Sequence, residues 1–262
     1  MTVYLELTRE FNVGALRAVI CSGQAAVLHR LAIASKDGDW ILREDSAALD
    51  HVLGVLARRG ARYRFGAPLD VRWMSGGWSA HLEFRHADLR VRTDFFTRPP
   101  RIHPGELERM WSEQEGRDPP FTDARILAEM KKTDREKDYP FIGELARRMQ
   151  DPRDRLAYSR SAADLIELAQ RHPALLQELI PVRPLLARVG AGRRALAEAI
   201  QLEMLDLMEQ DERRLAAYRE ASSAWARLWP ALSRELDGQP LPEAHARMLA
   251  SAADVLPRGV RS

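Results

Sequence analysis

The chain has 262 residues, 45% of them hydrophobic and 30% charged, which is enough apolar material for the core of one large domain or two small ones. Its formal net charge of +2, with acidic and basic residues nearly balanced in both halves, excludes a polycation that coats duplex DNA. We expect a cytoplasmic protein, because no apolar stretch approaches the roughly 18 residues of a membrane span, no signal peptide opens the chain, and the single cysteine, Cys21, excludes an internal disulfide.

The first hundred residues mix short helical and β patterns. Apolar spacing predicts helices over 23–31 and 46–59, with a strand over 40–43 between them. A β meander follows, with strands expected at 62–65, 70–74, 78–85 and 89–96. The strand at 78–85 alternates apolar and polar residues cleanly, so one face of this sheet is packed and the other is polar.

A proline-rich connector near residues 99–120 leads into a second half that is nearly all helical. Helices are predicted at 124–131, 139–150, 161–171, 173–180, 193–236 and 243–255. We expect the long one to break near Trp229-Pro230, because an interior proline removes a hydrogen bond and clashes with the preceding turn.

The motif most informative about function is Asp37-Gly38-Asp39, which precedes an apolar strand. Residues two apart in extended chain point to the same face, so the two carboxylates come together and suit a hard divalent cation such as Mg²⁺. Asp94, on a later strand, offers a third carboxylate on the same face as two arginines. The same Asp-Gly-Asp sequence is also common in surface turns, and that alternative stays open.

Two further features suit phosphate groups. Ser22-Gly23 stands at the mouth of a predicted helix, where backbone N–H groups and the positive helix end can meet an anion. Only four of the 40 basic residues are lysines, whose compact charge is suited to phosphate. Lys36 adjoins the Asp-Gly-Asp motif, and the other three lie between Lys131 and Asp138. A composition bias without function would explain the lysines equally well.

In this order, Ser22-Gly23, Asp37-Gly38-Asp39 and Asp94 resemble the motifs of the nucleotidyltransferase (DNA polymerase β-like) superfamily, particularly its bacterial abortive-infection and toxin-type branch. That family has a Gly-Gly or Gly-Ser pair opening a helix, a D-x-D strand and a lone Asp on a later strand. It often continues into K-x-x-x-R-x-K-D, and Lys131 to Asp138 are similar to that segment. The resemblance covers about residues 15–150. It implies an α+β fold, with a nucleotidyltransferase-like mixed sheet and flanking helices over 1–150 and a mainly α-helical domain over 151–262.

The resemblance implies transfer of a nucleoside monophosphate from a nucleoside triphosphate to an acceptor hydroxyl. It places Mg²⁺ (or Mn²⁺) on the catalytic carboxylates of Asp37, Asp39 and Asp94. It assigns nucleotide binding to Ser22, Gly23, Lys36, Lys132 and Lys137. The acceptor, whether RNA, protein or a small molecule, is not defined by the sequence. The helical domain is a candidate oligomer interface.

Two departures from the family pattern keep a second interpretation open. The pair is Ser-Gly, and Gly38 stands where the family prefers an aliphatic residue between the aspartates. A degenerate nucleotidyltransferase-fold protein, which binds without turnover and acts through its helical domain, is therefore the alternative. Nucleotide-sugar glycosyltransferases also use D-x-D, but the 36 residues before Asp37 are too few for their nucleotide-binding unit.

Overall fold

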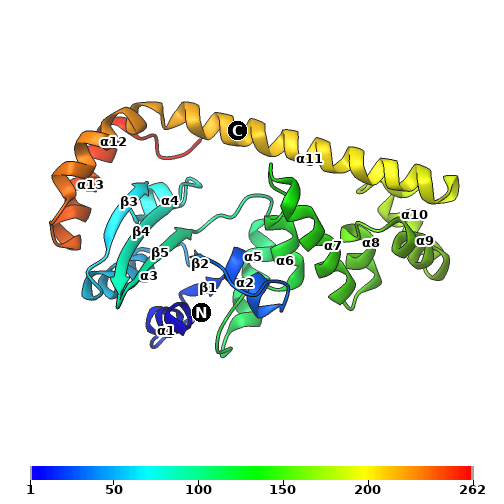
Figure 1. Ribbon diagram of the computed structural model, residues 1–262, viewed down its shortest axis with the longest axis horizontal. Coiled ribbons are helices and arrows are strands. Elements are labelled where there is room, and N and C mark those ends of the chain that lie inside the picture. The colour runs from blue at the N-terminus through cyan, green and yellow to red at the C-terminus, as the bar shows by residue number, and fades with distance from the viewer. Residues whose placement is uncertain (1, 261–262) are drawn as a thin grey trace. The chain divides into compact units, whose positions relative to one another are not determined.

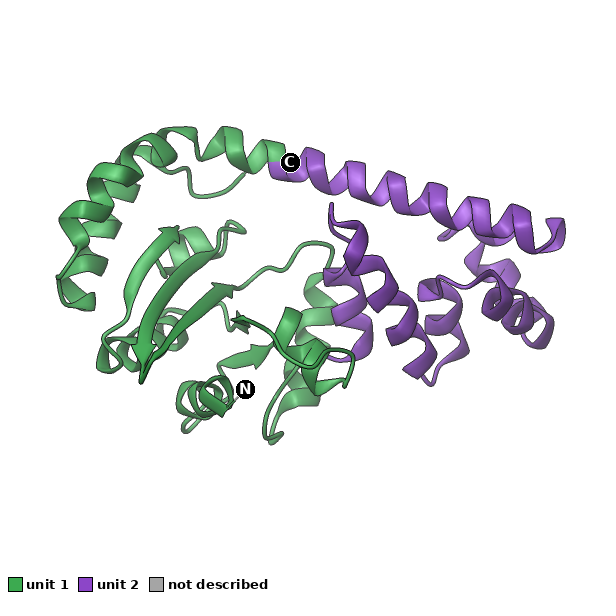
Figure 2. Ribbon diagram, viewed as in Figure 1, with its two compact units in different colours: residues 1–122, 216–262 green, residues 123–215 purple. Residues whose placement is uncertain are grey.

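The computed structural model describes residues 2–260, which form two compact units (Figure 2). The first unit contains the residues up to Thr122 and those from Ala216 onward, and the second contains Asp123–Leu215. These units divide the chain differently from the predicted boundary at residue 150. The reason is that the last helices contact strand β3 (Arg62–Gly66) and so return to the first unit.

The first unit is built around a five-stranded mixed sheet (Figure 1). Its other strands are β1 (Ala18–Ile20), β2 (Asp37–Leu42), β4 (Ala80–His86) and β5 (Leu89–Phe96). The strand order is β1-β2-β5-β4-β3. Strands β2 and β5 pair in parallel, and the other three pairings are antiparallel. The mixed sheet and its flanking helices confirm the predicted α+β class.

Helices account for most of the remaining chain. In the first unit they are α1 (Thr2–Phe11), α2 (Ser22–Leu28), α3 (Ser46–Arg58), α4 (Val71–Met74), α5 (Pro104–Gln114), α12 (Ser223–Leu236) and α13 (Leu241–Val255). The second unit contains α6 (Ala124–Met130), α7 (Tyr139–Arg148), α8 (Pro152–Tyr158), α9 (Ala162–Arg171), α10 (Pro173–Leu179) and most of α11 (Arg193–Ala221). No helix within residues 2–260 is both long enough and apolar enough to cross a membrane.

One face of the sheet is apolar, and aromatic side chains cover it. The ring of Trp40 on β2 stacks on Phe95 of β5 with centroids 5.5 Å apart, and Phe11 of α1 meets Trp40 edge-on at 5.3 Å. The Trp40 indole donates to Thr8 Oγ1 at 2.9 Å, so its polar edge is also satisfied inside the core. Helix α1 is therefore fixed over the centre of the sheet, and the opposite face is left for polar residues.

Three tryptophan indoles hold the C-terminal segment on the first unit. Trp225 donates to the carbonyl of Gly66 at 3.0 Å, Trp73 to that of Leu256 at 3.1 Å, and Trp78 to that of Pro257 at 2.8 Å. Trp73 is fully buried, so its hydrogen bond is made away from solvent. These bonds explain why residues far apart in the sequence belong to one compact unit.

Two predicted elements differ from the observed ones. The strand expected over 70–74 is the short helix α4, because Asp70 takes an extended N-cap conformation and its side chain accepts from the Arg72 amide. The long helix breaks at Ser222 rather than near Trp229-Pro230, and Pro230 lies inside α12. The Ser222 hydroxyl donates to the Tyr218 carbonyl at 2.8 Å, and the Ser222 amide donates to the same carbonyl at 2.9 Å, so the backbone hydrogen bond is kept where the two helices meet.

Acidification is expected to loosen the docking of α13. His245 Nδ1 lies 2.7 Å from the Tyr63 hydroxyl, and burial lowers the pKa of His245 below its ordinary value despite the opposing charge of Asp70. The unfolded chain therefore gains the proton first, so this contribution to stability is complete above about pH 6.5 and is lost as the pH falls toward the folded pKa. Thermal unfolding between about pH 7 and pH 5 measures it. His245→Gln should remove that part of the pH dependence; equal slopes in both proteins would contradict the assignment.

Candidate active site on the polar sheet face

The polar face of the sheet carries its charged side chains in cross-strand rows. One row begins at Asp39 on β2 and crosses the sheet through Asp94 on β5 and His81 on β4 to Phe65 on β3. The next row contains Asp37, Arg92, Glu83 and Arg62. A third row, on β5 and β4 alone, pairs Arg90 with Arg85. Neighbouring strands lie about 4.8 Å apart, so the structure brings Asp37, Asp39 and Asp94 onto one small area of the sheet.

Asp94 contacts two basic side chains. Arg64 donates to its Oδ1 at 2.7 Å, and His81 Nδ1 lies 2.8 Å from the same oxygen. Burial acts to raise the pKa of Asp94, but the contacts with His81 and Arg64 outweigh it and hold that pKa below its ordinary value. The carboxylate is therefore ionised at neutral pH and fixed in direction.

Asp37, unlike Asp94, has a carboxylate oxygen without a hydrogen-bond donor. Its Oδ1 is buried and accepts no hydrogen bond from the described side chains, and its ion-pair partner, Arg92 Nη1, lies 3.6 Å away. Its backbone is nevertheless well held, because the Asp37 carbonyl accepts from the Gln24 side chain at 3.2 Å and from the Ser35 hydroxyl at 3.1 Å. A buried carboxylate oxygen without a donor is costly, and such groups are concentrated where a ligand completes the site.

Gly38 lies between the two aspartates because the aromatic core fills the space that its side chain would need. A Cβ built there would lie 2.4 Å from the Trp40 ring and 2.5 Å from the Tyr4 ring. The Tyr4 hydroxyl, meanwhile, donates to the Lys36 carbonyl at 2.7 Å. The glycine that departs from the family pattern therefore lets α1 and Trp40 pack directly beneath the carboxylates.

Replacing Gly38 by valine is expected to destabilise the first unit by about 1–3 kcal/mol, because the added methyl groups overpack the contact with Trp40 and Tyr4. Urea denaturation measures the effect. Gly54→Ala is the matched control: its added Cβ comes no closer than 3.8 Å to any other residue, and it lies inside α3, where alanine favours the helix by about 0.5–1 kcal/mol. Equal effects of the two changes would show that Gly38 is not constrained by packing.

Ser22 and Gly23 lie beside the carboxylate strand. The Cys21 amide donates to the Asp39 carbonyl at 3.0 Å, and the chain then turns into α2. Ser22 has φ +54°, a left-handed conformation that costs a non-glycine residue energy. Gly23 has no room for a side chain, since an added Cβ would lie 2.3 Å from the Ser35 hydroxyl. The structure thus brings this predicted pair next to Asp37 and Asp39.

No known family model matches the chain, and no curated protein matches it significantly. Among solved structures, the chain is similar to one described as a "putative nucleotidyltransferase from H. pylori". The two chains are 12% identical, the match covers 81% of this chain and 96% of the other, and the TM-score is 0.37. A likeness this distant assigns no activity and no branch of a superfamily.

The acidic residues suit a divalent cation to different degrees. The orphaned oxygen of Asp37, next to a second carboxylate at Asp39, fits Mg²⁺, which proteins commonly hold with one or two carboxylates together with substrate phosphates. Asp94 fits less well as a ligand, since its Oδ1 is already occupied by Arg64 and His81. Among residues 2–260, no group of three or more Asp, Glu, His or Cys side chains stands ready to hold a metal ion. The assignment of Mg²⁺ or Mn²⁺ to this site stays a prediction.

The predicted lysines lie in different surroundings. Lys36 is exposed next to Asp37, in the first unit. Lys132 belongs to the second unit, where it pairs with Glu129 at 2.6 Å and lies over the Tyr158 ring. Lys137, in the same unit, is exposed and makes no ion pair within the described chain. Their predicted contacts with nucleotide phosphates therefore stay predictions.

Sequence patterns did not identify Arg64 and His81 as the partners of Asp94. The alternation of the 78–85 strand places His81 on the polar face, but its contact with Asp94 depends on strand register, which alternation does not specify. Arg64 reaches Asp94 because the β3–β4 pairing is irregular between Tyr63 and Phe65. Such bulges redirect side chains and leave little trace in composition.

Proposed function

We propose that the protein is a metal-dependent nucleotidyltransferase that moves a nucleoside monophosphate from a nucleoside triphosphate to an acceptor hydroxyl. The observation that supports this most directly is the row geometry: Asp39 lies opposite Asp94 on parallel neighbouring strands, with Asp37 on the same face. Parallel pairing brings the carboxylates together from segments more than fifty residues apart, beside the chain turn at Ser22 and Gly23.

The chain's own residues supply positioning and charge. Asp37 and Asp39 would hold Mg²⁺, which when bound neutralises phosphate charge and lowers the pKa of a coordinated hydroxyl. Asp94, kept ionised by Arg64 and His81, accepts a hydrogen bond from the acceptor hydroxyl and orients it. The hydroxyl oxygen then bonds to the α-phosphorus, the bond to the β-phosphate oxygen breaks, pyrophosphate leaves, and the hydroxyl proton passes to solvent.

A thermal-shift scan with ATP, GTP, CTP and UTP, each with and without Mg²⁺, tests the proposal. A nucleotide at 100 times its Kd should stabilise the protein by about 2.7 kcal/mol. We expect the shift to need Mg²⁺ and to disappear in Asp37→Asn. That variant should fold normally, because Asp37 Oδ1 makes no hydrogen bond and the Arg92 contact at 3.6 Å is partly solvated. No shift with any nucleotide would refute the proposal.

A second candidate is a nucleotide-binding protein without turnover. It is favoured by the contacts of Asp94, whose oxygen faces two basic groups rather than an open space for a substrate. This candidate predicts a nucleotide-dependent shift that is insensitive to Mg²⁺ and no release of pyrophosphate. The same scan, followed by a pyrophosphate assay, separates the two.

A further inference from the structure

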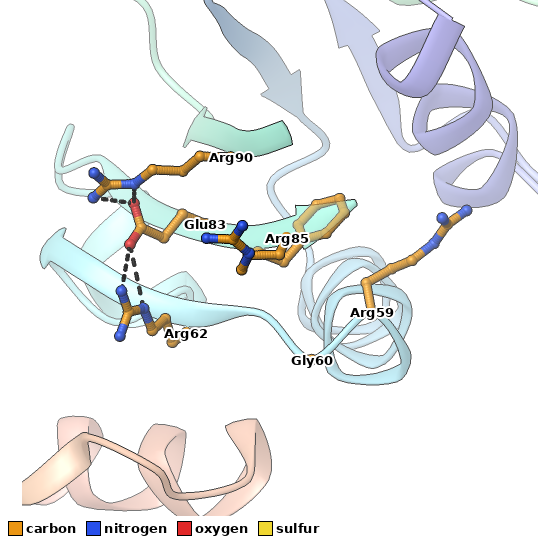
Figure 3. Close-up of a pocket in the computed structure, with 7 residues that line it drawn as sticks. Arg59, Gly60, Arg62, Glu83, Arg85 and Arg90 are labelled. Carbon is orange, nitrogen blue, oxygen red and sulfur yellow. Dashed lines mark hydrogen bonds and ion pairs between the residues drawn. The ribbon is translucent and has the colours of Figure 1, made fainter. Parts of the chain in front are cut away.

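A cavity of about 570 Å³ opens at the end of the sheet where the turn from α3 into β3 meets the β4–β5 hairpin (Figure 3). We call it the arginine pocket. It is lined by Arg59, Gly60, Arg62, Glu83, Phe84, Arg85 and Arg90. Four arginines and one acid therefore line a space large enough for a phosphate group and its hydration, with the Arg59 guanidinium turned away from the other three (Figure 3).

The single acid in the pocket organises two of the arginines. Glu83 is 4% exposed, and its two oxygens each face one neighbouring strand. Oε1 accepts from Arg62 at 3.1 Å and Oε2 from Arg90 at 2.6 Å (Figure 3). Both arginine side chains stay more than half exposed, at 61% and 55%. Arg62 also donates to Asp237, outside the lining, at 3.2 Å. Because a guanidinium carries five N–H donors, each of the two arginines still keeps donors for an external ligand.

The other two arginines are not paired inside the pocket. Arg85 is exposed and makes no ion pair or side-chain hydrogen bond within residues 2–260, although it projects from β4 between Glu83 and the hairpin. Arg59 meets its partner, Glu10, which does not line the cavity. The lining carries four arginines against one acid, and with Glu10 on Arg59 and Asp237 on Arg62 counted as well, a local excess of one positive charge remains. An exposed, uncompensated guanidinium such as that of Arg85 suits an anionic ligand.

The pocket and the candidate active site share one face of the sheet. Asp94, Arg92 and Arg90 alternate along β5, so the pocket lies about 13 Å along the strand from Asp94. On the same face, Phe65 is 47% exposed, and its ring stacks on His81 at 4.1 Å. Proteins that bind single-stranded nucleic acid combine an exposed aromatic ring, on which a base stacks, with nearby positive side chains that pair with the phosphates.

We propose that the arginine pocket binds a backbone phosphate of a single-stranded polynucleotide, with a base of the same strand on Phe65. Guanidinium groups suit this ligand because they bind phosphate oxygens in bidentate fashion. This assignment rests on the proposed function. Together, the two make the acceptor a polynucleotide whose terminal hydroxyl lies at Asp94. The spacing of about 13 Å favours an extended, repeating ligand over a single small anion.

Fluorescence anisotropy with a labelled ten-nucleotide single strand tests the proposal on the full chain. Arg85→Ala should weaken binding and lower the slope of log K against log salt by about 0.7, the value for one lost phosphate contact. The matched control is Arg227→Ala, since Arg227 is equally exposed on α12 and makes no ion pair within the described residues. Phe65→Leu should weaken binding by about fivefold or more without changing the slope.

Two results would overturn the proposal. One is equal affinity and equal salt slope for the Arg85 and Arg227 variants. The other is inorganic pyrophosphate that competes as strongly as the oligonucleotide at equal phosphate concentration, with the same dependence on Arg85, because the pocket would then hold a small anion. Oligonucleotide binding through Arg85 without any nucleotide transfer would refute the proposed function alone. Transfer to an acceptor that does not depend on Arg85 would refute only the pocket assignment.

Discussion

Replacing Asp94 by asparagine is expected to lower the rate of nucleotide transfer by about 10²–10⁴-fold, the range for a group that acts directly on a reacting hydroxyl. The substitution keeps the shape of the side chain and one carbonyl oxygen for Arg64, so the strand pairing survives. What is lost is the negative charge that orients the acceptor hydroxyl. Pyrophosphate release at saturating nucleotide measures the change, after the preferred nucleotide has been found.

The same substitution has a separate effect on stability. Charge-assisted contacts with Arg64 and His81 are worth about 1.5–3 kcal/mol, and Asp94→Asn should lose most of that. Since the folded pKa of Asp94 is depressed, its contribution is complete above about pH 4 and is lost as the pH falls through the folded pKa. The variant should therefore lose less stability than the wild type on acidification.

A matched control separates catalysis from charge. Asp254→Asn removes a carboxylate on the exposed side of α13, and it should change neither turnover nor stability measurably. If Asp94→Asn turned over at the wild-type rate, Asp94 would have no part in the reaction. If Asp94→Asn lowered stability and the wild-type protein itself showed no turnover, the result would favour the second candidate, a nucleotide-binding protein without turnover.

The sequence alone predicted which residues share the polar face better than it predicted which strands are neighbours. Alternation along 78–85 separated the packed face from the polar one, and Asp37 and Asp39 share a face because they are two residues apart in a strand. The parallel pairing of β2 with β5 could not be predicted, because an alternating pattern does not say which strands are neighbours. That pairing is what places Asp94 opposite Asp39.

Long-range contacts explain the other differences. The C-terminal helices look independent in sequence, yet the indoles of Trp225, Trp73 and Trp78 bind them into the first unit. Nothing local in Trp73 or Trp78 specifies a carbonyl partner some 180 positions away. The helix at Val71–Met74 was missed for the opposite reason: one capping residue, Asp70, outweighed the strand-like pattern that follows it.

The second large effect is expected in the lysine segment of the second unit, where Lys131→Met should reduce stability by about 3 kcal/mol. Lys131 Nζ pairs with Asp138 Oδ1 at 2.9 Å, and the two side chains are only 10% and 4% exposed. Removing one partner of a buried pair leaves an uncompensated charge, which typically costs about 3–5 kcal/mol. The contacts of Asp138 with Thr133 and Arg135 remain, so we expect the lower end of that range.

This prediction separates a structural lysine from a phosphate-binding one. Lys137 is exposed and unpaired within the described chain, so Lys137→Met should leave stability unchanged and, if the predicted nucleotide contact exists, raise the KM for nucleotide. Urea denaturation, combined with hydrogen exchange of α6 and α7, measures the Lys131 effect where it arises. The double variant Lys131→Met, Asp138→Asn should recover part of the loss, because the buried charge is gone. Full stability of Lys131→Met alone would contradict the structural role of Lys131.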